Sequence, residues 1–262
     1  MKLITIFQLL SIAVAQTATS IGQFLQNPIG YDRLDLSNQA INDLDAQELA
    51  QGLLLNNRMK IIDLSKNDIG PIGAVAVAHG MESSSKLSGL MFQDNHIGDQ
   101  GAIAIGQSIE SRSTLLGLWL DNNNIGNQGA IAVGQGIKSN QKLMYFHINN
   151  NHIGDQGVIS ICEGIIDNDA LAILKLSFNQ IEDDGAFAIA NVINGNTKMA
   201  VLDLMKNRIG DEGIAALNAS KSAGLALFTQ YQDPVVLDTT DPADDIKLLG
   251  HHGLEFFEVA EM

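Results

Sequence analysis

Few residues in this 262-residue chain have the types and spacing that catalysis or metal binding requires. His96 and His152 stand in matching turns two repeats apart, and strands about 4.8 Å apart would separate them by about 10 Å, too far to share one ion. His251, His252 and Glu255 are potential ligands without the repeated i, i+4 spacing of a helical metal site. The sequence contains no phosphate-binding loop, HExxH motif or nucleophile elbow. It therefore predicts no catalytic site, no metal site and no cofactor.

A lone cysteine and a set of aspartates are the remaining candidates for chemistry. Cys162 is the only cysteine, which excludes an intramolecular disulfide, and its position among small helix residues indicates a packing role. Asp99, Asp155, Asp183 and Asp211 lie just before helix starts. We expect these aspartates to cap those helices and to interact with the helix dipole, rather than to act as acids or bases.

The cysteine and the aspartates are positioned by a sequence repeat with a fixed period of 28 residues. In residues 115–137, Leu118 and Leu120 alternate with Gly117, Trp119 and Asp121, which predicts a short strand with one buried face. The buried strand position recurs at Leu34, Ile62, Leu90, Leu118, Phe146, Leu174 and Leu202. An asparagine column follows the strands and can satisfy backbone groups of the next turn: Asn67, Asn95, Asn123, Asn151, Asn179 and Asn207.

The pattern L-x-x-L-x-L-x-x-N at a fixed period is typical of leucine-rich repeats, and it resembles the ribonuclease-inhibitor class of them. The resemblance implies an α/β solenoid, a horseshoe with a parallel sheet on the concave face and helices on the convex face. Small residues in the helix columns should let neighbouring helices approach closely. Members of this class mostly bind proteins on the concave sheet or its rims, and they include the GTPase-activating proteins for Ran.

The repeat predicts the domain boundaries. Half a repeat and seven full repeats fill residues 16–218, and an acidic C-terminal cap or tail follows at 219–262. Residues 1–15 contain one lysine, an apolar run too short to span a membrane, and an Ala-x-Ala site, as in a signal peptide. We therefore expect an exported protein; the alternative is an N-terminal cap on a cytoplasmic protein.

The net charge of −15 argues against nucleic acid as a partner, because phosphates require clusters of Lys and Arg. Part of this charge lies outside the repeats, since residues 221–262 hold eight acidic residues against two lysines. The predicted concave face itself has a net charge of only −2, from Arg33 and Lys175 against Asp35, Asp63, Asp121 and Asp203. The acidity is therefore not concentrated on that face.

Strand parity places three rows of side chains on the face opposite the leucines, and Trp119 belongs to the central row. Trp119, the only tryptophan, lies in mid-solenoid between Met91 and His147, and Gly89 and Gly117 leave space beside it. We expect these side chains to be solvent-exposed and to form a contact patch for a protein or peptide. The predicted binding residues are Met91, Trp119, Tyr145, His147, Asp121, Asn149 and Lys175.

The sequence therefore predicts a non-catalytic, monomeric scaffold that binds a protein or peptide. Two alternatives remain open. The resemblance to Ran-directed activators allows a regulator of a small GTPase, whose rim residues would reorganise the partner's own site. A repeat array could also act purely as a structural spacer, although its exposed strand face should then lack a concentration of aromatic side chains.

Overall fold

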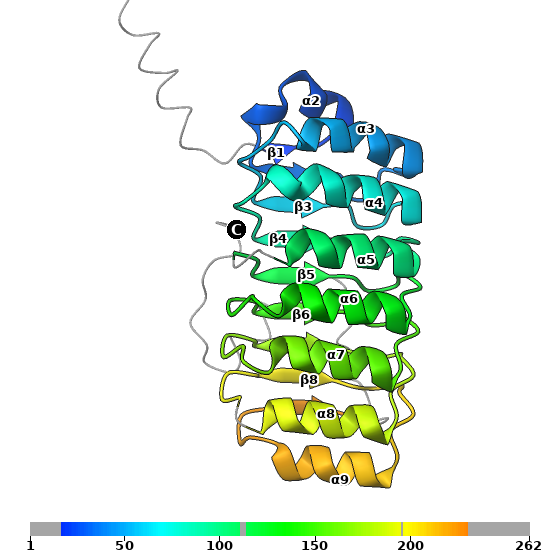
Figure 1. Cartoon of the computed structure of the whole chain (residues 1–262), viewed down its shortest axis with the longest axis vertical. Coiled ribbons are helices and arrows are strands. Elements are labelled where there is room, and N and C mark those ends of the chain that lie inside the picture. The colour runs from blue at the N-terminus through cyan, green and yellow to red at the C-terminus, as the bar shows by residue number, and fades with distance from the viewer. Residues whose placement is uncertain (1–16, 111–113, 195, 230–262) are drawn as a thin grey trace, which may run out of the picture.

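Alternating strands and helices stack in one direction to form an open, curved solenoid (Figure 1). The computed structural model describes residues 17–110, 114–194 and 196–229. Its strands are β1 (Thr17–Ala18), β2 (Arg33–Asp35), β3 (Ile61–Asp63), β4 (Gly89–Met91), β5 (Gly117–Trp119), β6 (Tyr145–His147), β7 (Ile173–Lys175), β8 (Val201–Asp203) and β9 (Ala226–Phe228). Its helices are α2 (Ile21–Gln26), α3 (Asp43–Leu53), α4 (Pro71–Gly80), α5 (Gly98–Ile109), α6 (Asn127–Ile137), α7 (Asp155–Ile165), α8 (Asp183–Ile193) and α9 (Asp211–Ser220), with 3-10 turns at Pro28–Gly30 and Met81–Ser83.

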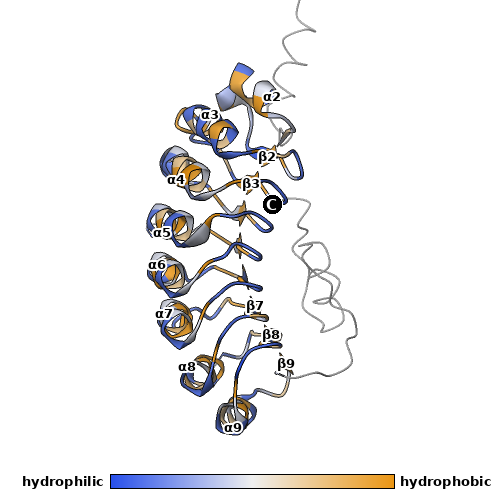
Figure 2. Ribbon diagram, turned by 90° about the vertical axis from the view of Figure 1, so that its right-hand side faces the viewer, coloured by the Kyte–Doolittle hydropathy of each residue, from blue (hydrophilic) through white to orange (hydrophobic). Residues whose placement is uncertain are grey.

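The strands form one parallel sheet in chain order, and the predicted leucine column is the register of that sheet. Leu34 pairs with Ile62, and the series continues through Leu118 and Phe146 to Leu202. These side chains are buried between the sheet and the helices, which all lie on one side of it, so that the strands line the concave side (Figure 2). The predicted α/β solenoid is thus confirmed, and its sheet continues beyond residue 218 through β9.

The asparagine column joins consecutive repeats, as its position predicts. The Asn151 side-chain oxygen accepts hydrogen bonds from the backbone N–H groups of Asn123 (3.1 Å) and Ile125 (2.9 Å) in the preceding repeat. Its amide donates to the carbonyls of Leu120 (3.0 Å) and Asn149 (2.9 Å). One side chain therefore satisfies backbone groups of two adjacent turns.

The aspartates do not cap their own helices, and this part of the sequence-based prediction is wrong. Each occupies the first turn of its helix, and the carboxylates of Asp99, Asp155 and Asp183 accept hydrogen bonds from the backbone at the start of the next helix. Asp99 Oδ1 accepts from the N–H groups of Gly126 (2.7 Å) and Gly129 (2.8 Å), and Asp183 Oδ1 does the same for Gly210 (2.7 Å). None of these helices has a side-chain hydrogen bond at its own N-cap, so these carboxylates link neighbouring repeats instead.

The one repeat that lacks this acceptor has a different helix start. Pro71 occupies the helix position that Asp99 and Asp183 hold in their repeats, and its side chain cannot accept a hydrogen bond. The next helix begins at Gly98, one residue before the corresponding position at Asp99. Gly98 adopts a positive φ of 55°, and its N–H donates to the Asn123 carbonyl instead (2.9 Å). The glycine permits this left-handed conformation without a β-carbon clash.

A second backbone feature recurs at the turn after each strand. The same position has a positive φ in every repeat, and Ala40 and Asn124 add a second such residue in two of them. The recurring residues are Asn38, Lys66, Asp94, Asn122, Asn150, Phe178 and Lys206. Asn and Asp adopt this conformation readily, whereas Phe178 does so with an exposed aromatic side chain. The turn geometry is therefore imposed by the repeat and does not depend on residue type.

Small residues do bring the helices together. A β-carbon on Gly134 in α6 would lie 2.5 Å from the Ser160 carbonyl oxygen in α7, and one on Gly106 would meet the Ala132 carbonyl. The backbone of one helix thus rests on the next, which limits the curvature that wider helix spacing would produce.

We expect Gly134→Ala to lower the free energy of unfolding by about 1 kcal/mol or more, because overpacking against a fixed backbone costs about 1–3 kcal/mol and exceeds the helix-propensity gain. Urea unfolding followed by circular dichroism measures this loss. Gly22→Ala in α2 is the matched control, since a β-carbon there meets nothing within 4 Å. It should gain up to about 1 kcal/mol. Equal effects of the two substitutions would contradict close helix packing.

Candidate functional site

A second apolar layer lies on the concave side of the sheet, across from the leucine core. We call it the concave cluster; it consists of Ile61, Met91, Trp119, Tyr145, Ala172, Ile173, Ala200 and Val201. Trp119 stacks on Tyr145 with ring centroids 6.1 Å apart and meets the edge of His147 at 5.8 Å. The indole leans over Gly117, where a β-carbon would collide with the ring. The structure therefore shows Trp119 on the central strand of this face, in the space that Gly117 leaves free, as the sequence predicts.

The predicted exposure of these residues is wrong. Trp119 is 2% exposed, Tyr145 7%, Met91 8% and Lys175 4%, while His147 is fully buried. Strand parity correctly assigns the face toward which each side chain points, but it carries no information about what covers that face. The concave cluster is therefore an apolar surface already removed from solvent.

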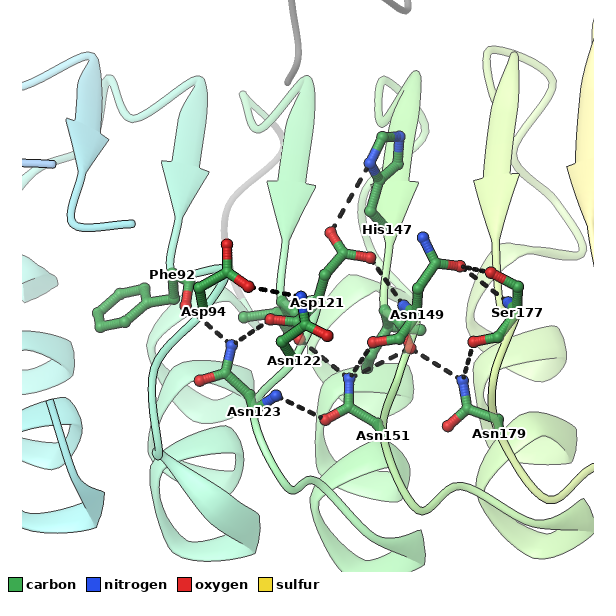
Figure 3. Close-up of polar contacts among 12 residues, drawn as sticks. Phe92, Asp94, Asp121, Asn122, Asn123, His147, Asn149, Asn151, Ser177 and Asn179 are labelled. Atoms are coloured by element: carbon green, nitrogen blue, oxygen red, sulfur yellow. Dashed lines mark hydrogen bonds and ion pairs between the residues drawn. The ribbon is translucent and has the colours of Figure 1, made fainter. Parts of the chain in front are cut away.

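A polar ladder continues the face at the carboxyl ends of β5, β6 and β7 (Figure 3). Asp121 Oδ1 accepts from the Asn149 backbone N–H (2.8 Å), and Asn149 Oδ1 accepts from both the N–H and the hydroxyl of Ser177 (2.8 Å each). The other carboxylate oxygen of Asp121 faces His147 Nδ1 at 3.8 Å. Asp121 and Asn149 thus connect the loops of neighbouring repeats, and Asp121 lies beside His147.

Three carboxyl groups on this face have altered acidity. Burial raises the pKa of Asp121 above the ordinary 3.8, and the charge of His147 and the hydrogen bond from Asn149 counteract this only in part. Burial also raises the pKa values of Asp63 and Asp203 on β3 and β8. The concave face therefore favours neutral carboxyl groups more than water does.

The other candidates for chemistry are dispersed. His96 and His152 are exposed turn residues on separate repeats. Cys162 is buried and free, and burial raises the pKa of its thiol to about 12, so the reactive thiolate does not form at neutral pH. Among residues 17–110, 114–194 and 196–229, no group of three or more His, Cys, Asp or Glu side chains is arranged to hold a metal ion. His251, His252 and Glu255 lie outside these residues.

A polar column at the opposite corner of the repeats is not apparent from the sequence pattern alone. Asn140 donates to the Leu115 carbonyl (2.7 Å), and Asn168 donates to the carbonyls of Asn140 (3.2 Å) and Leu143 (3.0 Å). Asn56 and Asn196 make corresponding bonds between repeats. The signal that could have revealed it is the 28-residue spacing of these asparagines, which lie in segments that otherwise vary.

The sequence model described as Leucine Rich repeat matches residues 56–78, 84–106, 139–162, 171–190 and 195–217. The chain thus has the fold of a leucine-rich-repeat solenoid, in which strand and helix alternate along one parallel sheet. No curated protein sequence matches the chain. Within the described residues, the helices are all too short or too polar to cross a membrane.

Two solved structures are similar to the chain at the level of the fold. An internalin from Listeria monocytogenes is 15% identical with a TM-score of 0.48; the alignment covers 83% of this chain and 59% of the internalin chain. Leiomodin-1 Actin-Binding Site 2 is 16% identical with a TM-score of 0.46, over 56% of this chain and 86% of that one. This chain thus spans less than two thirds of the internalin.

The buried carboxyl group of Asp121 makes a pH-dependent contribution to stability. Because its pKa is raised on folding, the folded chain binds more protons than the unfolded chain between the ordinary and the raised value. The free energy of unfolding therefore falls as pH rises from about 3.8 through that window. Asp121→Asn keeps an oxygen that accepts from Asn149 and removes the charge. We expect the variant to gain stability relative to wild type as pH rises from 3 to 7.

Thermal melts of both proteins across that range measure the difference. Asp63 and Asp203 are present in both proteins, so their own titration cancels in the comparison. If the wild type instead becomes more stable relative to the variant as pH rises, the ion pair with His147 outweighs the effect of burial on Asp121.

Proposed function

We propose that this protein is a non-catalytic scaffold of the ribonuclease-inhibitor class of leucine-rich repeats, and that its concave face binds a protein or an extended peptide. One observation carries the proposal: an aromatic and aliphatic cluster centred on Trp119 lies on the face opposite the leucine core. The leucine layer already forms the core between sheet and helices, so a second contiguous apolar layer on the opposite face supports a binding surface.

The residues of the concave cluster are of the types that dominate binding energy. Trp119 and Tyr145 are large and rigid, and they bury much area with little loss of side-chain entropy. The buried indole N–H of Trp119 has no hydrogen-bond acceptor within the part of the chain that the structure describes. A backbone carbonyl of a bound peptide would satisfy it. Asp121, Asn149 and Lys175 would then form the polar border of the contact.

The cluster also favours binding over the two alternatives. A spacer gains nothing from a tryptophan, a tyrosine and a methionine gathered on its inner face. A regulator of a small GTPase would act through polar rim residues, whereas the distinctive residues of this chain lie at the centre of the sheet. We therefore retain protein or peptide binding, without catalysis, as the function.

The binding test uses peptides selected from a random display library on the immobilised protein, with affinities measured by calorimetry. In the intact chain, Trp119→Ala should weaken binding of the selected peptides by about 2 kcal/mol or more. Because Trp119 is buried against Tyr145 and His147, the substitution should also lower stability, contrary to what an exposed side chain would predict.

Leu118→Ala is the matched control, one residue away on the other face. It should lose about 2–5 kcal/mol of stability through a cavity in the leucine core and still bind the peptides well below its melting temperature. Two outcomes would refute the proposal: Trp119→Ala that binds like wild type, or Leu118→Ala that loses as much affinity.

We also propose that the protein is exported, on the signal-peptide features of residues 1–15, which lie outside the described structure. Sequencing the N-terminus of the protein from its native cell should then find a start at or near Gln16. An intact Met1 or Lys2 in the soluble cytosol would refute export and favour a terminal cap.

A further inference from the structure

The turns that follow strands β6, β7 and β8 contain cationic and aromatic side chains but no carboxylate: residues 149–153, 177–181 and 205–209. We propose that Phe178, Lys206 and Arg208 form a rim site for a partner segment in which acidic residues adjoin an apolar one. The apolar side chain packs on Phe178, and the carboxylates pair with the two cations. This inference rests on the proposed function, because it gives the chemistry of the partner where that partner crosses this edge of the sheet.

Phe178 occupies a position that disfavours phenylalanine for two independent reasons. Its φ of 53° lies in the left-handed region, which Asn122 and Asn150 adopt at lower cost at the same position of the two preceding repeats. Its side chain is also 51% exposed, and water is an unfavourable environment for a phenyl ring. Folding alone therefore favours asparagine here, and contact with a partner is the gain that offsets both costs.

Backbone hydrogen bonds hold the turn of Phe178 beside the turn that carries the two cations. The Phe178 N–H donates to the Met205 carbonyl (2.8 Å), and the Arg208 N–H donates to the Ile181 carbonyl (2.8 Å). These bonds keep the two turns at the spacing of neighbouring strands, about 4.8 Å. One short segment of a partner can therefore contact Phe178 and the side chains of Lys206 and Arg208 together.

Arg208 is able to take a carboxylate from a partner. Its Nη1 lies 4.0 Å from Glu182 Oε1, and both side chains are exposed. An exposed ion pair of this length contributes little to stability, so a better-aligned carboxylate can replace Glu182. The neighbouring carboxylate of Asp183 is already engaged, because it accepts from the N–H of Gly210 (2.7 Å). The planar guanidinium can then bind both oxygens of the incoming carboxylate.

The rest of this rim repels such a segment. Asp68, Asp94 and Asp121 occupy the corresponding turns of the three preceding repeats, and like charges repel. The net charge of −15 likewise opposes the approach of a long polyanion. A short acidic stretch placed at Arg208 is governed by the nearest charges instead, because charges beyond about 10 Å are largely screened. The charges therefore select both the place and the length of the acidic stretch.

The rim site continues the surface proposed for binding. Ser177 ends the polar ladder that begins at Asp121, and it directly precedes Phe178 (Figure 3). Lys175 lies on the same edge in β7. A peptide lying on the concave cluster therefore reaches Phe178 by crossing the end of this one strand.

Phe178→Asn tests the aromatic contact without damage to the fold. Asparagine is the residue at positions 122 and 150, so the variant should melt at the wild-type temperature or above it. Peptides selected from the random display library should be rich in Asp or Glu beside Leu or Phe. By calorimetry they should bind the variant about fivefold or more weakly. Phe187→Gln, at another exposed phenylalanine on α8, is the matched control and should leave affinity unchanged.

Arg208→Glu tests the charge. The selected peptides should bind this variant about tenfold more weakly than wild type. Versions of the same peptides with lysine in place of their acidic residues should bind the variant better than wild type. Arg58→Glu, at an exposed position between α3 and β3, changes the net charge equally and should alter neither affinity. An equal loss in both charge variants would overturn the proposal, because net charge and not the rim site would then determine binding.

The remaining outcomes separate this inference from the proposed function. Peptides that need Trp119 but carry no acidic residue, or that bind Phe178→Asn and Arg208→Glu like wild type, would overturn the inference alone. Peptides that need Phe178 and Arg208 but bind Trp119→Ala like wild type would refute the concave site and leave the rim site standing. Self-association in sedimentation that Phe178→Asn abolishes would overturn the inference, because a second copy would then occupy the rim site.

Discussion

The structure depends on the satisfaction of backbone groups that no strand or helix of a single repeat can satisfy. The turn after each strand contains backbone N–H and carbonyl groups without a partner in their own repeat, and an unpaired buried N–H or carbonyl costs about 1–3 kcal/mol. The asparagine column supplies these bonds from the adjacent repeat, as Asn151 does for Ile125 and Leu120. A repeat is therefore complete only when it is stacked, which is why the period admits no insertion between residues 34 and 202.

The same stacking determines what the two faces of the sheet can do. Leucines fill one face because the helices cover it, so those positions tolerate little change. Side chains on the other face are free of that constraint, and in this protein they gather Trp119, Tyr145 and Met91 over the middle strands. Buried Asp121 and Lys175 flank them, so the concave side combines an apolar centre with ionisable side chains that are buried from water.

The fold was predictable from the sequence because the leucine spacing fixes register and parity at every strand. The roles of single polar residues were less accessible. Asp99 acts on Gly126, 27 positions later, and sequence spacing alone does not distinguish this from capping of its own helix. The sequence correctly placed Trp119 and His147 on the concave side of the sheet, but it wrongly predicted that they are exposed. Strand parity gives the direction in which a side chain points and does not show whether other atoms cover it. Asn140 and Asn168 were missed since the residues around them vary.

The two kinds of inter-repeat bond run in opposite directions along the chain, which has a consequence for synthesis on the ribosome. A helix start is capped by the carboxylate or amide of the preceding repeat, as Gly154 is by Asn127, and α3 begins the series with its own capping box at Asn42 and Asp45. A turn is completed only by the asparagine of the following repeat. During translation, the helix of the newest repeat can therefore be capped by the repeat before it, which has already folded. Its turn lacks hydrogen-bond partners until the asparagine of the following repeat has been translated. Repeats are therefore added to the folded solenoid at its C-terminal end only.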